Sequence, residues 1–428
     1  MDINRRTAYN TLLDIETKKQ YSNIALNNHI AFSKPSSPGF VRELVYGVLE
    51  NKYLLDYVID QLIPKDVSKM KKEDLTILRM GIYQIDRMNS VPDYAAVNES
   101  VLLAKRYAKG RDKFVNGVLR SFLSKRGTFD LTDEDKAKDI IKYLSVKYSY
   151  EPWIIKLWLE EYNINFVEEL LSAGNETPSV NIRVNTTKVR KEDLINILKD
   201  RGFEVEQGKF TDTALSVKGE GLLETKQYID GMFSIQDEAS QMVVKLLDPK
   251  PGDLVIDVCA APGGKALAAA EKMDNKGKVL ARDVYRRKVE VISSNAERLG
   301  LTNVVTNTWD ATKLDSTKCD MADKVIVDAP CSGLGVIRRK PEIKYIKDNG
   351  ALKELPKKQL LILTNAAAYV KKDGVLVYST CTINPNENRK VVGEFLRKNT
   401  SFKMIESRQV LPNIEGVDGF YMCKMVRV

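Results

Sequence analysis

Two of the five cysteines in this chain stand where a thiol can do chemistry. Cys331 lies in the segment Asp328-Ala329-Pro330-Cys331-Ser332-Gly333, and Cys381 ends Ser379-Thr380-Cys381. Each segment directly follows a short apolar run that is typical of a buried strand. The carboxyl ends of parallel strands meet at one edge of a sheet, so both thiols are expected at the same edge. A thiolate attacks readily and leaves readily, which suits covalent catalysis.

A third segment, Asp257-Val258-Cys259-Ala260-Ala261-Pro262-Gly263-Gly264-Lys265, has the form of a ligand-binding turn. It joins a predicted buried strand, Leu254 to Val258, to a predicted helix, Lys265 to Lys272, as nucleotide sites of open α/β folds do. It lacks the G-x-G-x-x-G of dinucleotide sites. Cys259 and Ala266 also replace the first glycine and the hydroxyl residue of a phosphate-binding P-loop. A nucleoside without phosphates fits the turn, and S-adenosylmethionine is the obvious candidate.

Charged residues near these segments are candidates for ligand binding. Asp283 follows the second predicted strand, 19 residues after Gly264 (283 − 264), where an acid reaches ribose hydroxyls in this fold. Asp310 follows the third strand, and its carboxylate can accept a hydrogen bond from an adenine amino group. Asp328 can bond the cofactor or a substrate base, and Lys265 can hold the base or lower a thiolate pKa. Helix capping by the aspartates and a surface position for the lysine are the structural alternatives.

Length and composition indicate several soluble domains. The chain has 428 residues, too many for one ordinary core, with 43% hydrophobic and 29% charged residues. No apolar run approaches the roughly 20 residues of a membrane span, and the polar N-terminus lacks a signal peptide. A cytoplasmic protein without membrane contact is therefore expected. One histidine and no C-x-x-C spacing predict no metal site. The net charge of +9 favours a polyanionic partner.

The hydrophobic periodicity predicts three domains and a linker. Residues 1–126 are predicted to form an all-α bundle of six or seven helices, and 127–149 a charged linker with a short helix. Residues 150–235 contain a strand, a helix and a second strand (179–184, 190–201 and 203–206), which suggests a small α+β subdomain. Residues 236–428 alternate between strands and helices as a doubly wound, Rossmann-like α/β sheet does. Its expected strands are Leu254–Val258, Lys278–Arg282, Val304–Thr308, Lys324–Val327 and Val375–Tyr378, with Gly419–Val428 as an edge strand.

The segment Asp257 to Lys265 resembles the cofactor motif of the RNA cytosine-5 methyltransferases of the Nol/Nop/Sun family. The segments Asp328 to Gly333, Ser379 to Cys381 and Asp418 to Met422 match further family motifs in the same order. The whole chain is most similar to the bacterial family members that act on small-subunit (16S) rRNA. Its N-terminal domain resembles a NusB-type RNA-binding domain. The stretches that carry this second resemblance are Phe40–Gly47, Met80–Gln84, Pro92–Glu99 and Lys113–Arg120.

The resemblance implies roles for particular residues. Cys381 is implied as the nucleophile that adds to carbon 6 of cytosine, and Cys331 as the residue that assists release, with Asp328 and Lys265 completing the catalytic set. The spacing of the two cysteines alone would not decide between them. The cofactor set is implied to be Cys259, Ala260, Ala261, Pro262, Gly263, Gly264, Lys265, Asp283, Asp310 and Asp328.

The resemblance also implies RNA contacts. Arg183 and Asn185 match the family's R-x-N element, which implies an RRM-like subdomain and RNA binding, although a solvent-facing strand explains them equally well. Arg338, Arg339 and Lys340 are placed to hold phosphates, or are a plain charged surface. A monomer acting on small-subunit rRNA is expected. The alternatives are the same chemistry on tRNA or large-subunit rRNA, and a non-catalytic RNA-binding assembly factor.

Overall fold

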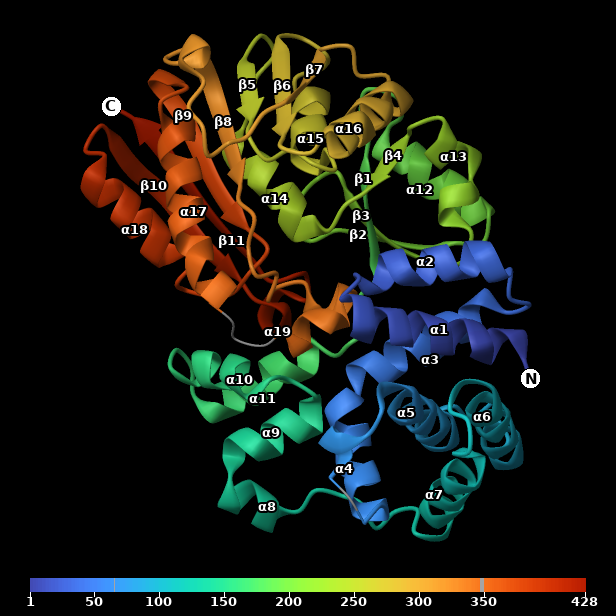
Figure 1. The fold of residues 1–428 in the computed structure, drawn as a ribbon. Helices are drawn as coiled ribbons and strands as arrows, with labels where there is room; N and C mark the ends of the chain where they lie inside the picture. The colour runs from blue at the N-terminus through green and yellow to red at the C-terminus, as the bar shows by residue number, and fades with distance from the viewer. Residues whose placement is uncertain (65, 347–349) are drawn as a thin grey trace. The chain divides into compact units, whose positions relative to one another are not determined.

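The computed structural model describes residues 1–64, 66–346 and 350–428 (Figure 1). The chain divides into two compact units. One, the helical unit, comprises Met1–Glu176 and Ile337–Lys347. The other, the sheet unit, comprises Thr177–Val336 and Asp348–Val428. None of the described helices is long and apolar enough to cross a membrane.

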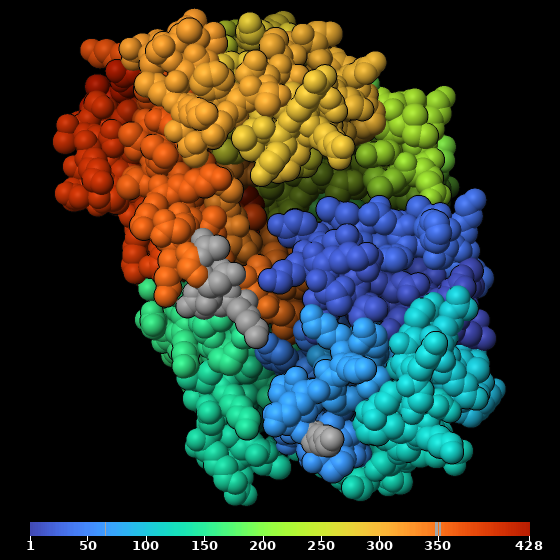
Figure 2. Space-filling model, in the orientation of Figure 1, coloured from blue at the N-terminus to red at the C-terminus, as the bar shows by residue number. Residues whose placement is uncertain are grey.

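The N-terminal part of the helical unit is the predicted all-α bundle. Its described helices are α1 (Ile3–Lys18), α2 (Ser22–Ser33), α3 (Pro38–Glu50), α4 (Lys52–Leu62), α5 (Lys72–Arg87), α6 (Asp93–Tyr107) and α7 (Asp112–Ser124), with the short η1 (Val67–Lys69). The apolar residues at 3–4 spacing, such as Leu44 on α3 and Leu78 on α5, are fully buried in one core that extends from α1 to α7. The outer surface of this bundle is blue to cyan in Figure 2. Pro92 and Gly110, the latter at φ 78°, separate the last three helices as the sequence predicts.

The helical unit also contains the helices that follow this bundle. Helices α8 (Asp133–Lys138), α9 (Ile140–Tyr148), α10 (Pro152–Leu159) and α11 (Ile164–Ala173) all belong to the helical unit, with η4 (Ile337–Arg339) and η5 (Pro341–Tyr345). The buried Lys344 fastens this region, because its Nζ donates to the carbonyls of Glu50 and Tyr148 and to Asn175 Oδ1. Residues 150–176, the first part of the predicted accessory subdomain, belong to the helical unit.

The accessory part of the sheet unit is a four-stranded antiparallel sheet. Its strands β1 (Val180–Val184), β2 (Glu204–Gln207), β3 (Ala214–Lys218) and β4 (Phe233–Ile235) have the order β2-β3-β1-β4. Helix α12 (Lys191–Asp200) packs its buried Leu194 and Leu198 against the sheet, and η2 (Leu222–Glu224) and α13 (Lys226–Ile229) follow. The predicted strand, helix and strand are confirmed. The two strands are not neighbours, however, because β3 lies between them.

The larger sheet of this unit is the predicted doubly wound sheet. Its strands are β5 (Leu254–Asp257), β6 (Lys278–Asp283), β7 (Val304–Thr308), β8 (Ala322–Asp328), β9 (Val370–Thr380), β10 (Phe402–Val410) and β11 (Phe420–Arg427), in the order β10-β11-β9-β8-β5-β6-β7. Strands β5 to β9 are parallel, whereas β11 and β10 are antiparallel to their neighbours. The helices are α14 (Glu238–Leu247), α15 (Gly264–Lys272), α16 (Arg286–Leu299), α17 (Gly350–Ala367), α18 (Arg389–Lys398) and α19 (Pro412–Glu415), with η3 (Ser316–Lys318).

Helices cover both faces of this sheet (Figure 1). Successive residues of β5 show the arrangement, since Val255 packs in the core with α14, α15 and α16, whereas Ile256 packs in the core with α17 and α18. Strands buried on both faces explain the continuous apolar runs in the sequence.

The prediction that the C-terminal strand lies at the edge of the sheet is wrong. Strand β11 pairs on one side with β9 and on the other with β10, which is the edge strand. The segment Phe402–Val410 has no alternation of apolar and polar residues. In the structure only its two end residues are buried, and the rest are exposed or partly exposed. Its periodicity therefore gave no sign of a strand, and only its pairing with β11 defines it.

Candidate active site

The turn between β5 and α15 is held in a conformation that only small residues allow. Gly263 has φ 109°, and a Cβ at this position would lie 2.9 Å from a methyl of Leu267. The Gly263 N–H donates to the carbonyl of Ala260 at 2.6 Å, and the Ala260 N–H donates to the carbonyl of Arg282 at 2.7 Å. The bond between Ala261 and Pro262 is cis. Main chain is thus exposed to a ligand at the N-terminus of α15, where nucleotide-like ligands bind.

Asp257 ends β5 beneath this turn and is fully buried. Its Oδ1 accepts from the Cys259 N–H at 3.2 Å, but its buried Oδ2 has no partner among the described residues. Burial, and to a lesser extent repulsion from Asp328, raises the pKa of Asp257 to about 7. A buried acceptor without a donor fits a ligand that brings a positive charge or an N–H group, as S-adenosylmethionine does.

The two predicted strand-end acids lie at the carboxyl ends of the next two strands of the sheet, β6 and β7. Asp283 ends β6 and is buried, and its Oδ1 accepts from the Tyr285 N–H at 3.1 Å. Asp310 follows β7, and its Oδ1 accepts from the Thr312 N–H and hydroxyl at 3.0 and 2.7 Å, which lowers its pKa. Within the described ranges, Oδ2 of each aspartate accepts no hydrogen bond from protein. Each residue therefore caps a turn with one oxygen, and ligand binding by the other oxygen stays a prediction.

The two candidate thiols meet at the ends of β8 and β9. Cys331 Sγ lies 3.2 Å from Cys381 Sγ. The strands are parallel neighbours with Asp328 opposite Ser379, so the loops that follow leave the sheet side by side. The hydrogen bond with Cys381, together with burial, raises the pKa of Cys331 well above its ordinary value. Cys259, by contrast, lies in the turn near three carboxylates, and burial above all raises its pKa.

Lys265 and Asp328 form an ion pair next to the thiol loops. Lys265 Nζ lies 2.7 Å from Asp328 Oδ2, and the Ser379 hydroxyl donates to Asp328 Oδ1 at 2.9 Å. The lysine side chain is 8% exposed, so it is not the surface residue of the structural alternative. Its Nζ also lies 4.9 Å from the centre of the Phe420 ring, a cation–π contact. Residue type alone indicated no role for Phe420, although it lies in the segment Asp418 to Met422 that matches a family motif.

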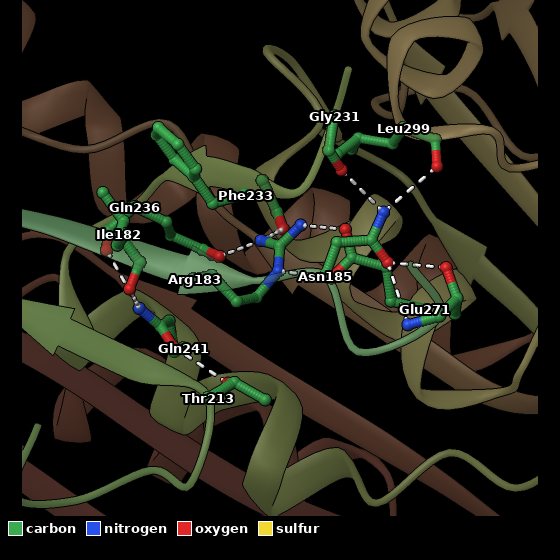
Figure 3. Close-up of polar contacts among 12 residues, drawn as sticks. Ile182, Arg183, Asn185, Thr213, Gly231, Phe233, Gln236, Gln241, Glu271 and Leu299 are labelled. Carbon is green, nitrogen blue, oxygen red and sulfur yellow. Dashed lines mark hydrogen bonds and ion pairs between the residues drawn. The ribbon is translucent and has the colours of Figure 1, made fainter. Parts of the chain in front are cut away.

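Arg183 and Asn185 do not form an RNA-binding surface. Arg183 is 3% exposed and Asn185 is fully buried. Figure 3 shows Arg183 pointing from β1 toward Glu271, with Nε and Nη2 each 2.8 Å from one carboxylate oxygen. Its Nη1 donates to the carbonyl of Gly264 at 2.9 Å and also to Gln236 Oε1. Arg183 therefore joins the accessory sheet to both ends of α15, next to the ligand-binding turn.

Asn185 makes a second internal connection. Its Nδ2 donates to the carbonyls of Gly231 and Leu299 at 3.0 and 3.1 Å (Figure 3). Its Oδ1 accepts from the N–H and hydroxyl of Thr187 at 3.2 and 2.6 Å. The predicted RNA contacts of Arg183 and Asn185 are thus corrected, because both side chains are buried and their bonds lie inside the sheet unit.

The basic residues Arg338, Arg339 and Lys340 lie in and directly after η4, in the helical unit. All three are partly buried, and Lys340 Nζ lies 5.2 Å from the centre of the Tyr21 ring. The ring contact does not exclude phosphate binding, since the ammonium group of Lys340 has three N–H donors. Phosphate binding by these three residues stays a prediction.

The raised pKa of Asp257 predicts a pH-dependent stability. The folded state holds this proton more tightly than the unfolded state, so the stabilisation is complete below about pH 4 and is lost as pH rises through about 7. Relative to wild type, Asp257→Asn should therefore gain unfolding free energy as pH rises from 5 to 8, measured by urea denaturation. Asp310→Asn, whose carboxyl pKa is lowered, should show a constant difference over this range. A constant difference for Asp257→Asn would contradict the assignment.

Comparisons with known proteins agree with this architecture. Residues 244–426 match the family model "16S rRNA methyltransferase RsmB/F", residues 2–124 match the NusB family, and residues 150–222 match the RsmF/B-like ferredoxin-like domain. A probable ribosomal RNA small subunit methyltransferase B from Bacillus subtilis is 38% identical, over 98% of each chain. The ribosomal RNA small subunit methyltransferase B of Serratia proteamaculans is 29% identical, over 91% of this chain and 90% of its own.

Solved structures show the same fold. The crystal structure of PH0851 superposes with a TM-score of 0.82 and 26% identity, covering 99% of this chain and 98% of its own. NSun6 from Pyrococcus horikoshii, solved with SFG, has a TM-score of 0.60 and 22% identity, covering 64% of this chain and 97% of its own. The chain therefore belongs to the RsmB family of ribosomal RNA methyltransferases, which depend on S-adenosylmethionine.

Proposed function

We propose that this protein transfers a methyl group from S-adenosylmethionine to carbon 5 of a cytidine in small-subunit rRNA, with Cys381 as the nucleophile. The observation that carries the proposal is the thiol pair, with 3.2 Å between Cys331 Sγ and Cys381 Sγ, at the sheet edge that also holds the Lys265–Asp328 ion pair. Carbon 5 of cytosine is a poor nucleophile until a group adds to carbon 6, and a thiolate is suited to add and to leave.

The electrostatics of the pair support a division of labour. Because the pKa of Cys331 is raised, this residue keeps its proton at neutral pH. A protonated Cys331 can donate to Cys381 Sγ, and a hydrogen bond to a thiolate favours its charged form. With Cys331 as the donor, Cys381 takes the role of nucleophile that the family resemblance implies. The same S–H group can hydrogen-bond the departing sulfur and so assist release.

Addition to carbon 6, stabilisation of the adduct and release of the sulfur each have a protein group suited to them, whereas the carbon-5 proton passes to solvent. The Cys381 thiolate adds to carbon 6, and carbon 5, now enamine-like, takes the methyl group. The carboxylate of Asp328, held by Lys265 and Ser379, is suited to bond nitrogen 3 and stabilise the protonated adduct. Loss of the carbon-5 proton and expulsion of Cys381 complete the cycle.

The methyl donor would be held by the turn and the strand-end acids. The turn from Cys259 to Lys265 offers main chain at the N-terminus of α15, and Asp257 keeps an unpartnered buried oxygen there. Asp283 is placed for the ribose hydroxyls and Asp310 for the adenine amino group, each through its Oδ2.

The substrate assignment is supported by the relatives named as small-subunit rRNA enzymes and by the NusB match of residues 2–124. A cytosine must be unpaired or flipped out of its helix to reach the thiols. Methylation of tRNA or large-subunit rRNA is the nearest alternative. Deletion of the NusB-type domain should abolish activity on the true substrate if that domain recognises it.

The test offers labelled S-adenosylmethionine and the full chain three substrates in parallel: unmodified small-subunit rRNA, large-subunit rRNA and tRNA. Digestion to nucleosides should show label in 5-methylcytidine from the small-subunit rRNA alone. Label in another nucleoside would contradict the chemistry, and label from another RNA would contradict the substrate. Failure to bind S-adenosylmethionine in calorimetry would favour a non-catalytic assembly factor.

A further inference from the structure

Glu387 is a fully buried carboxylate behind the two cysteine loops. It precedes α18 and accepts hydrogen bonds from the Ser332 N–H at 2.8 Å, the Ser332 hydroxyl, Gln359 Nε2 at 2.9 Å and Asn384 Nδ2 at 2.9 Å. All of these partners are neutral groups. Four donors satisfy the two oxygens of this carboxyl group, which has no access to water. This arrangement of four donors is specific to a carboxylate, in which both oxygens accept hydrogen bonds. The side-chain NH2 group of a glutamine would face one of the four donors instead of accepting from it.

These bonds connect the loop of one cysteine to the loop of the other. Ser332 directly follows Cys331, and its hydroxyl also bonds the hydroxyl of Thr382, the residue directly after Cys381, at 2.8 Å. Glu387 thus bonds the first loop through Ser332 and the second through Asn384.

Further bonds brace the same two loops. Gln359 Nε2 is shared between Glu387 and the carbonyl of Pro330, and the Gly335 N–H donates to the carbonyl of Cys381 at 3.0 Å. Asn388 Nδ2 donates to the carbonyl of Thr382 at 2.9 Å. Glu387 is the group that accepts from both loops and from α17 at once. It therefore joins three segments, whereas the direct bonds between the loops join only two.

We infer that Glu387 is a positioning residue that fixes the spacing of Cys331 and Cys381 by joining their loops. Among the described residues its carboxyl group makes no hydrogen bond to either sulfur, and it holds the two loops through Ser332 and Asn384. Its consequence for catalysis rests on the proposed function, whereas its consequence for thiol spacing does not. The two consequences can therefore be measured separately.

The thiol spacing is tested with phenylarsine oxide, which bridges two neighbouring thiols. Both thiols lose their protons, two arsenic–sulfur bonds form and the oxygen leaves as water. Intact-mass spectrometry of the full chain should show one adduct in wild type and none in Cys331→Ala or Cys381→Ala. We expect Glu387→Gln to form the adduct at least about 10-fold more slowly. Glu415→Gln is the matched control. The Glu415 carboxylate also accepts a hydrogen bond from a main-chain N–H of the sheet unit, that of Leu411, but it bonds to neither cysteine loop.

The catalytic consequence is measured by methyl transfer. A displacement of about 1 Å in a reacting group can cost on the order of 100-fold in rate, so Glu387→Gln should lose kcat by about that factor with little change in KM for S-adenosylmethionine. Glu415→Gln should keep the wild-type kcat. A purely stabilising Glu387 would instead lower the thermal midpoint and leave the kcat of the folded variant unchanged.

Two outcomes would overturn the inference. One is a folded Glu387→Gln with the wild-type rate of adduct formation. The other is equal slowing in Glu415→Gln. If Glu387→Gln does not fold, Ser332→Ala replaces it, because this variant removes the hydroxyl bonds to Glu387 and Thr382 but keeps the Ser332 N–H bond. Ser332→Ala with wild-type adduct formation would then overturn it. Absence of methyl transfer in wild type would refute the proposed function, and the adduct result would still stand.

Discussion

Cys331→Ala should accumulate a covalent complex with small-subunit rRNA in the presence of S-adenosylmethionine, whereas Cys381→Ala should form none and transfer no methyl group. The reason is the division of labour within the thiol pair. Without Cys381 no group adds to carbon 6. Without Cys331 the adduct forms, but the departing sulfur lacks its hydrogen-bond donor. Loss of the nucleophile should lower kcat/KM by at least about 10⁴-fold, on the scale seen when a covalent catalyst is removed.

A denaturing gel with labelled RNA separates the outcomes, with wild type, both single variants and the double variant run side by side. Cys319→Ala is a suitable control, because Cys319 is a free thiol after η3, away from the strand ends that carry the pair. Trapping in Cys381→Ala and not in Cys331→Ala would mean that the two roles are reversed. If neither variant forms a covalent complex with RNA while the wild type transfers the methyl group, the covalent mechanism is contradicted.

Arg183→Ala should destabilise the sheet unit by about 3–5 kcal/mol, because it leaves the carboxylate of Glu271 buried without its partner. The two side chains are 4% and 5% exposed, so water cannot replace the guanidinium. The same change removes the donor from the carbonyl of Gly264, which begins α15 at the ligand-binding turn. Weaker binding of S-adenosylmethionine should therefore accompany the loss of stability.

Urea denaturation and calorimetry measure the two effects. The double variant Arg183→Met/Glu271→Met should be less destabilised than the sum of the single variants, because it buries no unpaired charge. Arg190→Met is the matched control, since Arg190 pairs with Asp193 on the surface with its side chain 82% exposed, and it should leave the midpoint unchanged. If Arg183 instead contacted RNA, Arg183→Ala would weaken RNA binding and leave the urea midpoint at its wild-type value.

Much of the fold follows from local features of the sequence. Strands β5, β6, β8 and β9 contain apolar runs because a central parallel strand covered on both faces buries most of its residues, so the pattern is visible without tertiary information. Strand β7, at the edge of the sheet, is largely exposed or half-buried and has no such run. The short segments after β5, β8 and β9 also place the turn and the two cysteines at one sheet edge. This follows because parallel strands end on the same side. The helical N-terminal bundle follows from 3–4 spacing in the same way.

Other features depended on contacts between residues far apart in the chain. Strand β10 exists through its pairing with β11, and residues 150–176 join the helical unit through Lys344, which lies more than 160 positions away. The structural role of Arg183 became visible only from its burial and its ion pair with Glu271. The residue type does not reveal this role, because an arginine can bind a phosphate or a buried carboxylate equally well.

The sequence by itself determined the chemistry available here: two thiols at strand ends, a turn of small residues and the acids beside them. These are properties of residue type and local order. Only the tertiary structure decided that the thiols lie 3.2 Å apart, that Lys265 pairs with Asp328 and that Glu387 joins the two loops. Distances and buried hydrogen bonds arise when β5, β8, β9 and α17 pack together, and no local pattern encodes that packing.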